Sequence, residues 1–557
     1  MSASSEKLEK ALSEYFRHTF SFIETVRNFT TTSSEWIRQR EEEKSTLANI
    51  SEKARDVRNR FNQVKKAKQR AKAFGTFVGD SIVPGRASKK QAELEKELET
   101  ELEVLLQRIL EGLREMQIFL DAVEKLAVTS DRVFEKTLVV RLSIKTDLES
   151  VKRIILAARI IGPLVLLFKR NNEEFFKTQL HNVEVMQIQL DQYIGTIKDI
   201  CSLFEECSVA DLVLKSPTVF LDLDVREHDA GKMLERINTR SQIRMDEHLR
   251  MVFLFRDEHG TFMEMFRERR ERMLEVLDEL EPCAVKLDRM NKGARVSNVV
   301  GSSVGVVGGG LAIAGLALAP FTAGLSLGLT VAGAATAVTS GANGIVTMVT
   351  EKVVTSKQKE KANEVFKRFM KDVDELQNCV KEAINQHFQS TENSDLLKAL
   401  KETGKGAAGM KSIDAIFDCS AVVKLWKAEK AVVKVAGSGR AVSKAASDVP
   451  ELGQAALKGP LAMSKAARGG FIIVNALFIG LDVFVIANEG MSLSRGSETE
   501  TSKWIRARAA LWRSEVNSFQ RINDSLEEGQ ELSEKKKVLQ EPFYEGDVMD
   551  KTGQKGN

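Results

Sequence analysis

Apolar residues recur at intervals of three and four along most of the chain, the spacing that places them on one face of an α-helix. The clearest stripe lies between Gln91 and Ala127, and its members are Leu94, Leu98, Leu102, Leu105, Ile109, Leu113, Met116, Leu120, Val123 and Leu126. The intervening "ELEKELETELE" supplies a charged face. The stripe predicts a long helix in a bundle or a coiled coil, and the helical pattern resumes after "VTSDR" and continues to about Phe204.

Two stretches depart from this amphipathic pattern. Ile154–Phe168 is apolar on almost every side, apart from Arg159 and Pro163, and is too short to cross a bilayer comfortably. We interpret it as the most buried helix of a soluble bundle, with an interfacial segment as the alternative. Cys207–Gly231 breaks the helical period and predicts a connector.

The first 75 residues end in a basic run, "RNRFNQVKKAKQRAKAF" (58–74). On a helix this run places charge around an apolar stripe, which suits an anionic surface, although a solvated helix face is the alternative. The Gly, Pro and Ser residues of Gly75–Ser88 then predict a loop or linker.

An apolar window dominates the second half of the chain, because no Asp, Glu, Lys or Arg occurs between Arg295 and Glu351. The window is long enough for two helices of about 20 residues, the length that crosses a bilayer. Pro320 divides it and predicts a turn between two antiparallel helices, the hairpin 296–350. Small residues four positions apart share a helix face and allow close packing in a membrane. The candidate packing residues are Gly301, Gly305 and Gly309 in the first arm, Pro320 at the turn, and Gly324 and Gly328 in the second arm.

The glycines also argue against a permanent membrane anchor. Each costs roughly 1 kcal/mol relative to Ala in a helix, so about ten of them disfavour an isolated hairpin by on the order of 10 kcal/mol. The hairpin therefore needs packing partners, either the rest of the chain or a bilayer. We predict a conditional insert that amphipathic helices shelter until it is triggered; a hairpin that never leaves the core is the alternative.

A second apolar run, Gly469–Gly490, has a marginal balance for membrane insertion. Its Phe, Ile, Val and Leu residues, about a dozen, favour insertion by roughly 5 kcal/mol in sum, whereas a charged Asp near the middle costs about 3 kcal/mol. That residue is Asp482, and Glu489 lies seven positions later on the same helix face. The two are candidates for a cation pathway or a pH trigger, with a soluble helix whose acids face water as the alternative. An amphipathic helix follows, with Ser497 and Thr499 as candidate caps.

Composition narrows the classes of function. At 557 residues, with 29% charged residues and only 8 prolines, the chain favours two or three largely helical domains. A net charge of +3 does not indicate a generic nucleic-acid binder. Five scattered cysteines without CxxC spacing indicate a reducing compartment, and the charged N-terminus shows no secretory pattern. We expect residence in the cytosol, with intracellular membranes reached from that side.

The sequence contains no recognisable catalytic constellation. None of the six histidines forms HExxH or pairs with Cys at zinc spacing, and no GxSxG elbow occurs. Gly404–Ser412 approaches a phosphate-binding loop, but Met410 separates Gly409 from Lys411 and moves the ammonium group off the phosphates. We therefore expect no enzymatic activity, no cofactor and no metal.

From about Phe266 to Glu528 the chain resembles the apolipoprotein L family. The resemblance rests on "RMNKGARVSNVVGSSVGVVGGGLAIAGLALAPFTAGLSLGLTVAG" and on "NALFIGLDVFVIANE" followed by "GSETETSKWIRARAALW". It implies a helical, lipid-binding, membrane-associated protein with a pore-forming region similar in logic to bacterial colicins. Family members are linked to lipid transport, membrane permeabilisation, intracellular membrane dynamics and innate defence. In the pore-forming member, an Asp and a Glu seven residues on are implicated in cation conduction and pH gating, and they fall on Asp482 and Glu489 here.

We expect an all-α fold, in which an elongated helical bundle or coiled coil joins an α-helical domain with a Gly-rich apolar hairpin. The expected regions are charged helices and a linker at 1–88, a bundle or coiled coil at 89–264, an apolipoprotein L-like domain at 265–533 and a disordered tail at 534–557. The expected partners are anionic phospholipid membranes and a second copy of the chain bound through 91–127, with no nucleic acid. A non-catalytic coiled-coil scaffold is the alternative function, and an extracellular, lipoprotein-associated location is the alternative that the resemblance implies.

Overall fold

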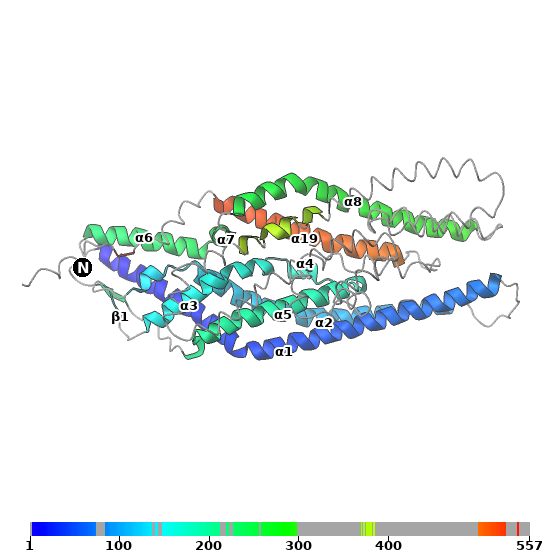
Figure 1. Cartoon of the computed structure of the whole chain (residues 1–557), viewed down its shortest axis with the longest axis horizontal. Coiled ribbons are helices and arrows are strands. Elements are labelled where there is room, and N and C mark those ends of the chain that lie inside the picture. Colours follow the sequence, from blue (N-terminus) through cyan, green and yellow to red (C-terminus); the bar gives the residue numbers. More distant parts are fainter. Residues whose placement is uncertain are drawn as a thin grey trace, which may run out of the picture.

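A computed structural model of the chain describes most of the first 297 residues, a short helical stretch near residue 375 and a C-terminal helix. The described residues are 3–73, 84–135, 140–142, 147–211, 219–221, 227–255, 258–297, 369, 371–373, 375–380, 382–384, 500–530 and 543–544. They form an elongated body whose long helices run close to its long axis (Figure 1). The predicted hairpin 296–350, beyond Ser297, and the second apolar run 469–490 lie outside the described residues.

Two long helices, α1 (Ala3–Ala73) and α2 (Pro84–Ala127), pack against each other. Trp36 Nε1 of α1 donates a hydrogen bond to the Gly112 carbonyl of α2 at 2.9 Å, and Lys53 donates to Glu101. Because the residue number falls along α2 as it rises along α1, the helices are antiparallel. α2 begins at Pro84, so the linker prediction is wrong for residues 84–88; proline fits the first turn of a helix, where its missing N–H would have no partner.

The apolar stripe predicted between Gln91 and Ala127 lies on α2 and is buried, apart from the half-buried Leu94. It packs against α1 along most of its length and against α3 and η2 towards its end. One chain therefore already covers the stripe within a helical bundle. Homo-oligomerisation through 91–127 stays a prediction.

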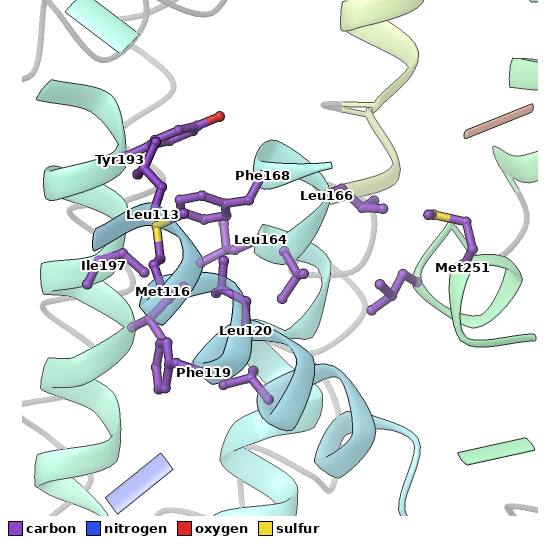
Figure 2. Packing of buried hydrophobic residues seen from close by; sticks show 14 of the residues in the cluster. Leu113, Met116, Phe119, Leu120, Leu164, Leu166, Phe168, Tyr193, Ile197 and Met251 are labelled. Atoms are coloured by element: carbon purple, nitrogen blue, oxygen red, sulfur yellow. The ribbon is translucent and has the colours of Figure 1, made fainter. Parts of the chain in front are cut away.

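Seven short or medium helical segments are described between the end of α2 and Asp211. They are η1 (Asp131–Phe134), α3 (Leu148–Ile161), η2 (Gly162–Phe168), α4 (Asn172–Phe175), η3 (Leu180–Asn182), α5 (Val183–Glu206) and η4 (Val209–Asp211). Figure 2 shows side chains of α2, η2, α5 and the later helix α7 converging in the core.

α3 and η2 contain the apolar segment Ile154–Phe168, so its predicted burial is confirmed, although it is not one helix because the 3-10 helix η2 begins at Gly162. All of its residues are buried except Leu156, Arg159 and Leu167, which are half-buried. Pro163 stands at the start of η2, where it cannot donate the hydrogen bond that would continue α3.

Arg159 is the charged residue within that segment, and its guanidinium is paired. Its Nη2 atom lies 2.8 Å from the Thr129 carbonyl, just beyond the end of α2, and 3.0 Å from Asp131 Oδ1. Carbonyls at the C-terminal end of a helix lack partners within it and attract cations. Arg159 thus joins α3 to the end of α2.

A two-stranded antiparallel ribbon interrupts the helices. β1 (Val140–Leu142) pairs with β2 (Val219–Leu221), with Val140 opposite Leu221. β2 lies within the predicted connector Cys207–Gly231, which also ends sooner than expected because α6 begins at Glu227. Strands of three residues are too short to show an alternating pattern in the sequence. The all-α fold class is confirmed.

The remaining described helices are α6 (Glu227–Met245), α7 (Glu247–Phe255), α8 (His259–Ser297) and α19 (Glu500–Gln530). α19 packs on α8 and α7 and also contacts η3 and α4. One continuous apolar core extends from Leu8 to Phe543 and crosses the boundary expected between residues 264 and 265. Within the expected tail, Phe543 is buried and the Tyr544 hydroxyl donates to the Val133 carbonyl at 3.2 Å.

The contact between α1 and α2 leaves no room for a side chain at Gly112. A Cβ atom there would overlap the guanidinium of Arg40, which is buried and paired with Glu43 at 2.6 Å. We expect Gly112→Ala to lower the free energy of unfolding by about 1–3 kcal/mol, because Arg40 must move. Gly195→Ala in α5 is the control, since a Cβ atom meets nothing within 4 Å there. It should raise the free energy of unfolding by up to about 1 kcal/mol. Urea denaturation followed by circular dichroism measures both, and equal effects would contradict the assigned packing.

Candidate functional site

α8 and α19 form an antiparallel helical pair. Three ion pairs join them, Arg506 with Glu281, Arg513 with Asp278 and Arg267 with Glu527, at N···O distances of 3.0, 2.5 and 3.1 Å. Between the helices, Phe262 and Phe519 make an edge-to-face contact with ring centroids 6.3 Å apart. The residue number falls along α8 as it rises along α19, which requires opposite directions.

This pairing places the two ends of the segment 298–499 at the same end of the body. α8 ends at Ser297 and α19 begins at Glu500, and Figure 1 shows both helices reaching towards one end of the long axis. The second apolar run and all of the predicted hairpin beyond Ser297 belong to 298–499. The two described helix ends that border this segment therefore lie at one end of the body.

The tip of the α1–α2 pair lies towards the same end. Figure 1 shows the C-terminal end of α1 and the N-terminal end of α2 there, and Lys503 of α19 lies 3.3 Å from Glu95 of α2. The sequence between Arg58 and Lys90 contains ten Lys or Arg residues and one acidic residue, Asp80.

The last turns of α8 add four basic residues against one acidic residue, Asp288. The basic residues are Lys286, Arg289, Lys292 and Arg295. We call the C-terminal ends of α1 and α8, together with the N-terminal ends of α2 and α19, the basic end. Its excess of positive charge creates a field that attracts anionic surfaces.

A helical stretch at 369–384, which we call the docking segment, packs against α8 and α19. Arg272 of α8 binds Asp372 through two hydrogen bonds, Nε to Oδ2 and Nη2 to Oδ1, both 2.6 Å long. Arg269 Nη2 donates to Glu375 Oε2 at 2.9 Å. On the other side, Phe369 contacts Trp512 of α19 with ring centroids 5.7 Å apart.

The two ion pairs of the docking segment share one register. In the pair of Arg269 with Glu375 and in the pair of Arg272 with Asp372, the residue halfway along the intervening chain is residue 322. α8 and the docking segment are thus paired antiparallel, with equal lengths of chain on either side of residue 322. The turn predicted at Pro320 lies two residues from this midpoint.

The pKa of Glu375 shows that its ion pair persists in mild acid. Burial opposes ionisation, but hydrogen bonds from Arg269 and Lys371 outweigh it and hold the pKa of this carboxyl below its ordinary value. A lowered pKa in the folded state means that the pair stabilises the fold above the ordinary carboxyl pKa of about 4.3 and is lost only as the pH falls through the lower folded value. At pH 5 the Glu375 carboxylate therefore still holds Arg269.

Buried charges join α7 and α19 to the N-terminal helices. Glu124 of α2, which is 1% exposed, accepts hydrogen bonds from Arg250 of α7 at 2.9 Å and Lys169 at 2.6 Å. Glu515 of α19 accepts two from Arg170, at 2.7 and 2.9 Å. Paired and hydrogen-bonded charges of this kind resist separation, because breaking the pair leaves a buried charge uncompensated.

The site residues predicted from sequence all lie outside the described residues. They are Gly301, Gly305, Gly309, Pro320, Gly324, Gly328, Asp482 and Glu489. The sequence gives no sign of the pairing of α8 with the docking segment, because carboxylates and arginines at helical spacing are common on any charged helix. The turn predicted at Pro320 could have suggested that the chain on its two sides pairs antiparallel, but not which charges meet.

Among the described helices, none is long and apolar enough to cross a membrane. The same part of the chain contains no cluster of His, Cys, Asp or Glu that could hold a metal ion.

Comparison with known proteins shows to which family the helices of this site belong. The family model for apolipoprotein L matches residues 223–519, which is more than half of the chain. The chain belongs to the apolipoprotein L family. The apolipoprotein L match includes α6, α7, α8, the docking segment and most of α19, whereas α1 to α5 precede it. It begins earlier than the start near Phe266 that the sequence resemblance suggests.

Two human relatives are each 26% identical to this chain. Apolipoprotein L3 from Homo sapiens matches over 259 residues, which cover 44% of this chain and 57% of the relative. Apolipoprotein L6 from Homo sapiens matches over 306 residues, which cover 54% of this chain and 84% of the relative. The chain thus spans little more than half the length of apolipoprotein L3. No solved structure matches the chain.

Removal of one partner should cost much more stability in the buried ion pairs of Glu124 than in an exposed ion pair. We expect Glu124→Ala to lower the free energy of unfolding by about 3 kcal/mol, since Arg250 is 5% exposed and keeps only Asp121 as an acidic partner. Lys53→Ala, which breaks the exposed pair with Glu101, should cost less than about 1 kcal/mol. Chemical denaturation of both variants tests this. A Glu124→Ala cost as small as that of Lys53→Ala would show that the buried ion pairs of Glu124 do not join the helices.

Proposed function

We propose that this protein is a non-enzymatic, lipid-binding member of the apolipoprotein L family that conditionally inserts the hairpin 296–350 into membranes. It acts from the cytosol on intracellular membranes with anionic lipid. Lipid transport, membrane remodelling and permeabilisation, including a role in innate defence, are the outcomes that family membership suggests.

The observation that carries this proposal is the register of α8 and the docking segment. Two ion pairs place the midpoint of the intervening chain at residue 322, and the sequence independently predicts a turn at Pro320. The apolar window occupies the middle of that interval and contains no charged residue between Arg295 and Glu351. A charge-free segment with a central turn, held at its base by an antiparallel helix pair, supports a hairpin long enough to enter a bilayer.

The basic end supports a membrane as the partner. Each Lys or Arg near an anionic membrane surface contributes about 1 kcal/mol of attraction, within a screening distance of about 10 Å at 0.1 M salt. The C-terminal end of α1, the N-terminal end of α2 and Ser297, which precedes the charge-free window, all lie towards this end. Electrostatic attraction would therefore bring the body to the surface with the apolar segment nearest the lipid.

Cation conduction is the finer part of the proposal. We assign it to the second apolar run, where Asp482 and Glu489 share one helix face. A carboxylate within a membrane helix is costly unless it faces protein or a water-filled path. Such a path lined by Asp482 and Glu489 would favour cations.

Charged substitutions in the hairpin test insertion. We expect Val307→Lys with Ala335→Lys to abolish leakage from phosphatidylserine–phosphatidylcholine vesicles and retention on membranes after alkaline extraction. Each Lys near the middle of a membrane helix costs about 2.5–3.5 kcal/mol. Both changes lie between Arg295 and Glu351, far in sequence from the basic stretch 58–90. Salt-sensitive binding to the same vesicles should therefore remain.

Val104→Lys is the matched control, because Val104 is an exposed apolar residue of α2 and is 60% exposed. It should leave leakage and retention unchanged. Wild-type protein that binds no anionic vesicle at pH 7 or pH 5 would overturn the proposed function.

A further inference from the structure

The docking segment lies in the sequence between the two apolar segments, after the hairpin 296–350 and before the run 469–490. It contributes one apolar face to the core. Its buried apolar residues are Phe369, Val373, Leu376, Cys379, Val380, Ala383 and Ile384. The part of the chain that follows the hairpin is thus fixed to the body by this short stretch.

The position of the docking segment along α8 restricts the hairpin. Arg272 lies 25 residues before Ser297, where α8 ends, and a helix of that length spans roughly 38 Å. While Asp372 is bound, residue 372 is held about this far from the end of α8. Release of the docking segment would free that length of chain and let the hairpin extend from the basic end into the bilayer.

Each ion pair that holds the docking segment has one partly exposed partner, unlike the buried pair of Glu124 with Arg250. Arg272 and Glu375 are 34% and 30% exposed, and their partners Asp372 and Arg269 are 3% and 15% exposed. The side chains of Glu124 and Arg250 are 1% and 5% exposed. Solvent screens partly exposed pairs and lowers their contribution. Local opening therefore occurs more readily at the docking segment than at the buried cluster of Glu124.

We propose that residues 369–384 are a releasable clasp, in which the ion pairs Arg272–Asp372 and Arg269–Glu375 hold the hairpin back from the membrane until the segment detaches from α8 and α19. The clasp rests on the proposed function, because it regulates the insertion of that same hairpin. A phosphate headgroup is a competing partner for the two guanidinium groups, since phosphate accepts the same paired hydrogen bonds as a carboxylate.

Cysteine reactivity reports the opening of the clasp. Cys379 of the docking segment is 7% exposed and Cys201 of α5 is 2% exposed. Burial raises the pKa of both thiols to about 12, so neither forms the thiolate that reacts with an alkylating reagent while it is covered. Release of the clasp would expose Cys379 alone, whereas unfolding would expose both.

The test compares two double variants of the full chain with the same change of charge. Asp372→Asn with Glu375→Gln removes the acidic partners of the clasp. Asp278→Asn with Glu281→Gln removes two acidic residues that pair α8 with α19 at exposed positions. Labelling with iodoacetamide at pH 7.5, located by peptide mass spectrometry, measures the rates at Cys379 and Cys201.

The clasp variant should label Cys379 roughly tenfold faster than the wild type and leave Cys201 unchanged. The control variant should label Cys379 at the wild-type rate. An unchanged Cys379 rate in the clasp variant would overturn the proposal, and so would equal acceleration at both cysteines, which would assign the ion pairs to global stability. If the double variant does not accumulate, Glu375→Gln alone should accelerate labelling of Cys379 roughly threefold, and no acceleration would overturn the proposal.

Measurement of vesicle leakage distinguishes a failure of the clasp proposal from a failure of the proposed function. With phosphatidylserine–phosphatidylcholine vesicles, the clasp variant should cause faster leakage than the wild type and the control variant. Faster Cys379 labelling without faster leakage would show that the segment detaches but does not restrain the hairpin, which would overturn the clasp. No leakage from any variant, including wild type, would instead count against the proposed function.

Discussion

α8 and α19 pack antiparallel through the buried apolar core, in which Phe262 contacts Phe519, and the arrangement of the functional segments depends on that direction. Arg506 with Glu281 and Arg267 with Glu527 lie at opposite ends of the pairing. Because the helices run in opposite directions, a segment of some two hundred residues begins and ends at one end of the body. A parallel pairing would place its two ends far apart along the long axis.

The N-terminal helices extend the fold beyond the region that matches the apolipoprotein L model. They are not a separate unit, since one apolar core and the buried charges of Glu124 and Glu515 join them to α7 and α19. The charges in this junction are paired on both sides, so the cost of burying them is offset only when the two halves are together. The α1–α2 pair thereby carries its basic tip to the same end as α8 and α19. The N-terminal extension thus supplies positive charge where the family region supplies the apolar segment.

The sequence predicts the helices well because their apolar periodicity is strong. The stripe from Leu98 to Leu126 appears on α2 and is buried, and the apolar segment containing Ile154 is buried as well. The sequence around Pro320 also indicated the family to which the chain belongs. The partners of individual charges were not predictable, since Asp372 and Arg272 are separated by a hundred residues and neither has a distinctive local pattern. The ribbon of β1 and β2 was not predicted, because strands of three residues are too short to show an alternating apolar pattern. For the candidate site, the sequence predicts the apolar segments. It does not predict which helices pack beside the ends of those segments, because that depends on contacts between residues far apart in the chain.

We propose that the docking segment leaves α8 when the hairpin enters a membrane. A distance measured by electron spin resonance between spin labels at Glu275 and Lys371 tests this movement most directly. Glu275 is exposed on α8, and Lys371 lies in the docking segment with a side chain that is 72% exposed. Labels at these sites should give one short distance in the protein alone and a longer, broader distribution when phosphatidylserine–phosphatidylcholine vesicles are added. A short distance that persists in membrane-bound protein that has made the vesicles leak would contradict the account.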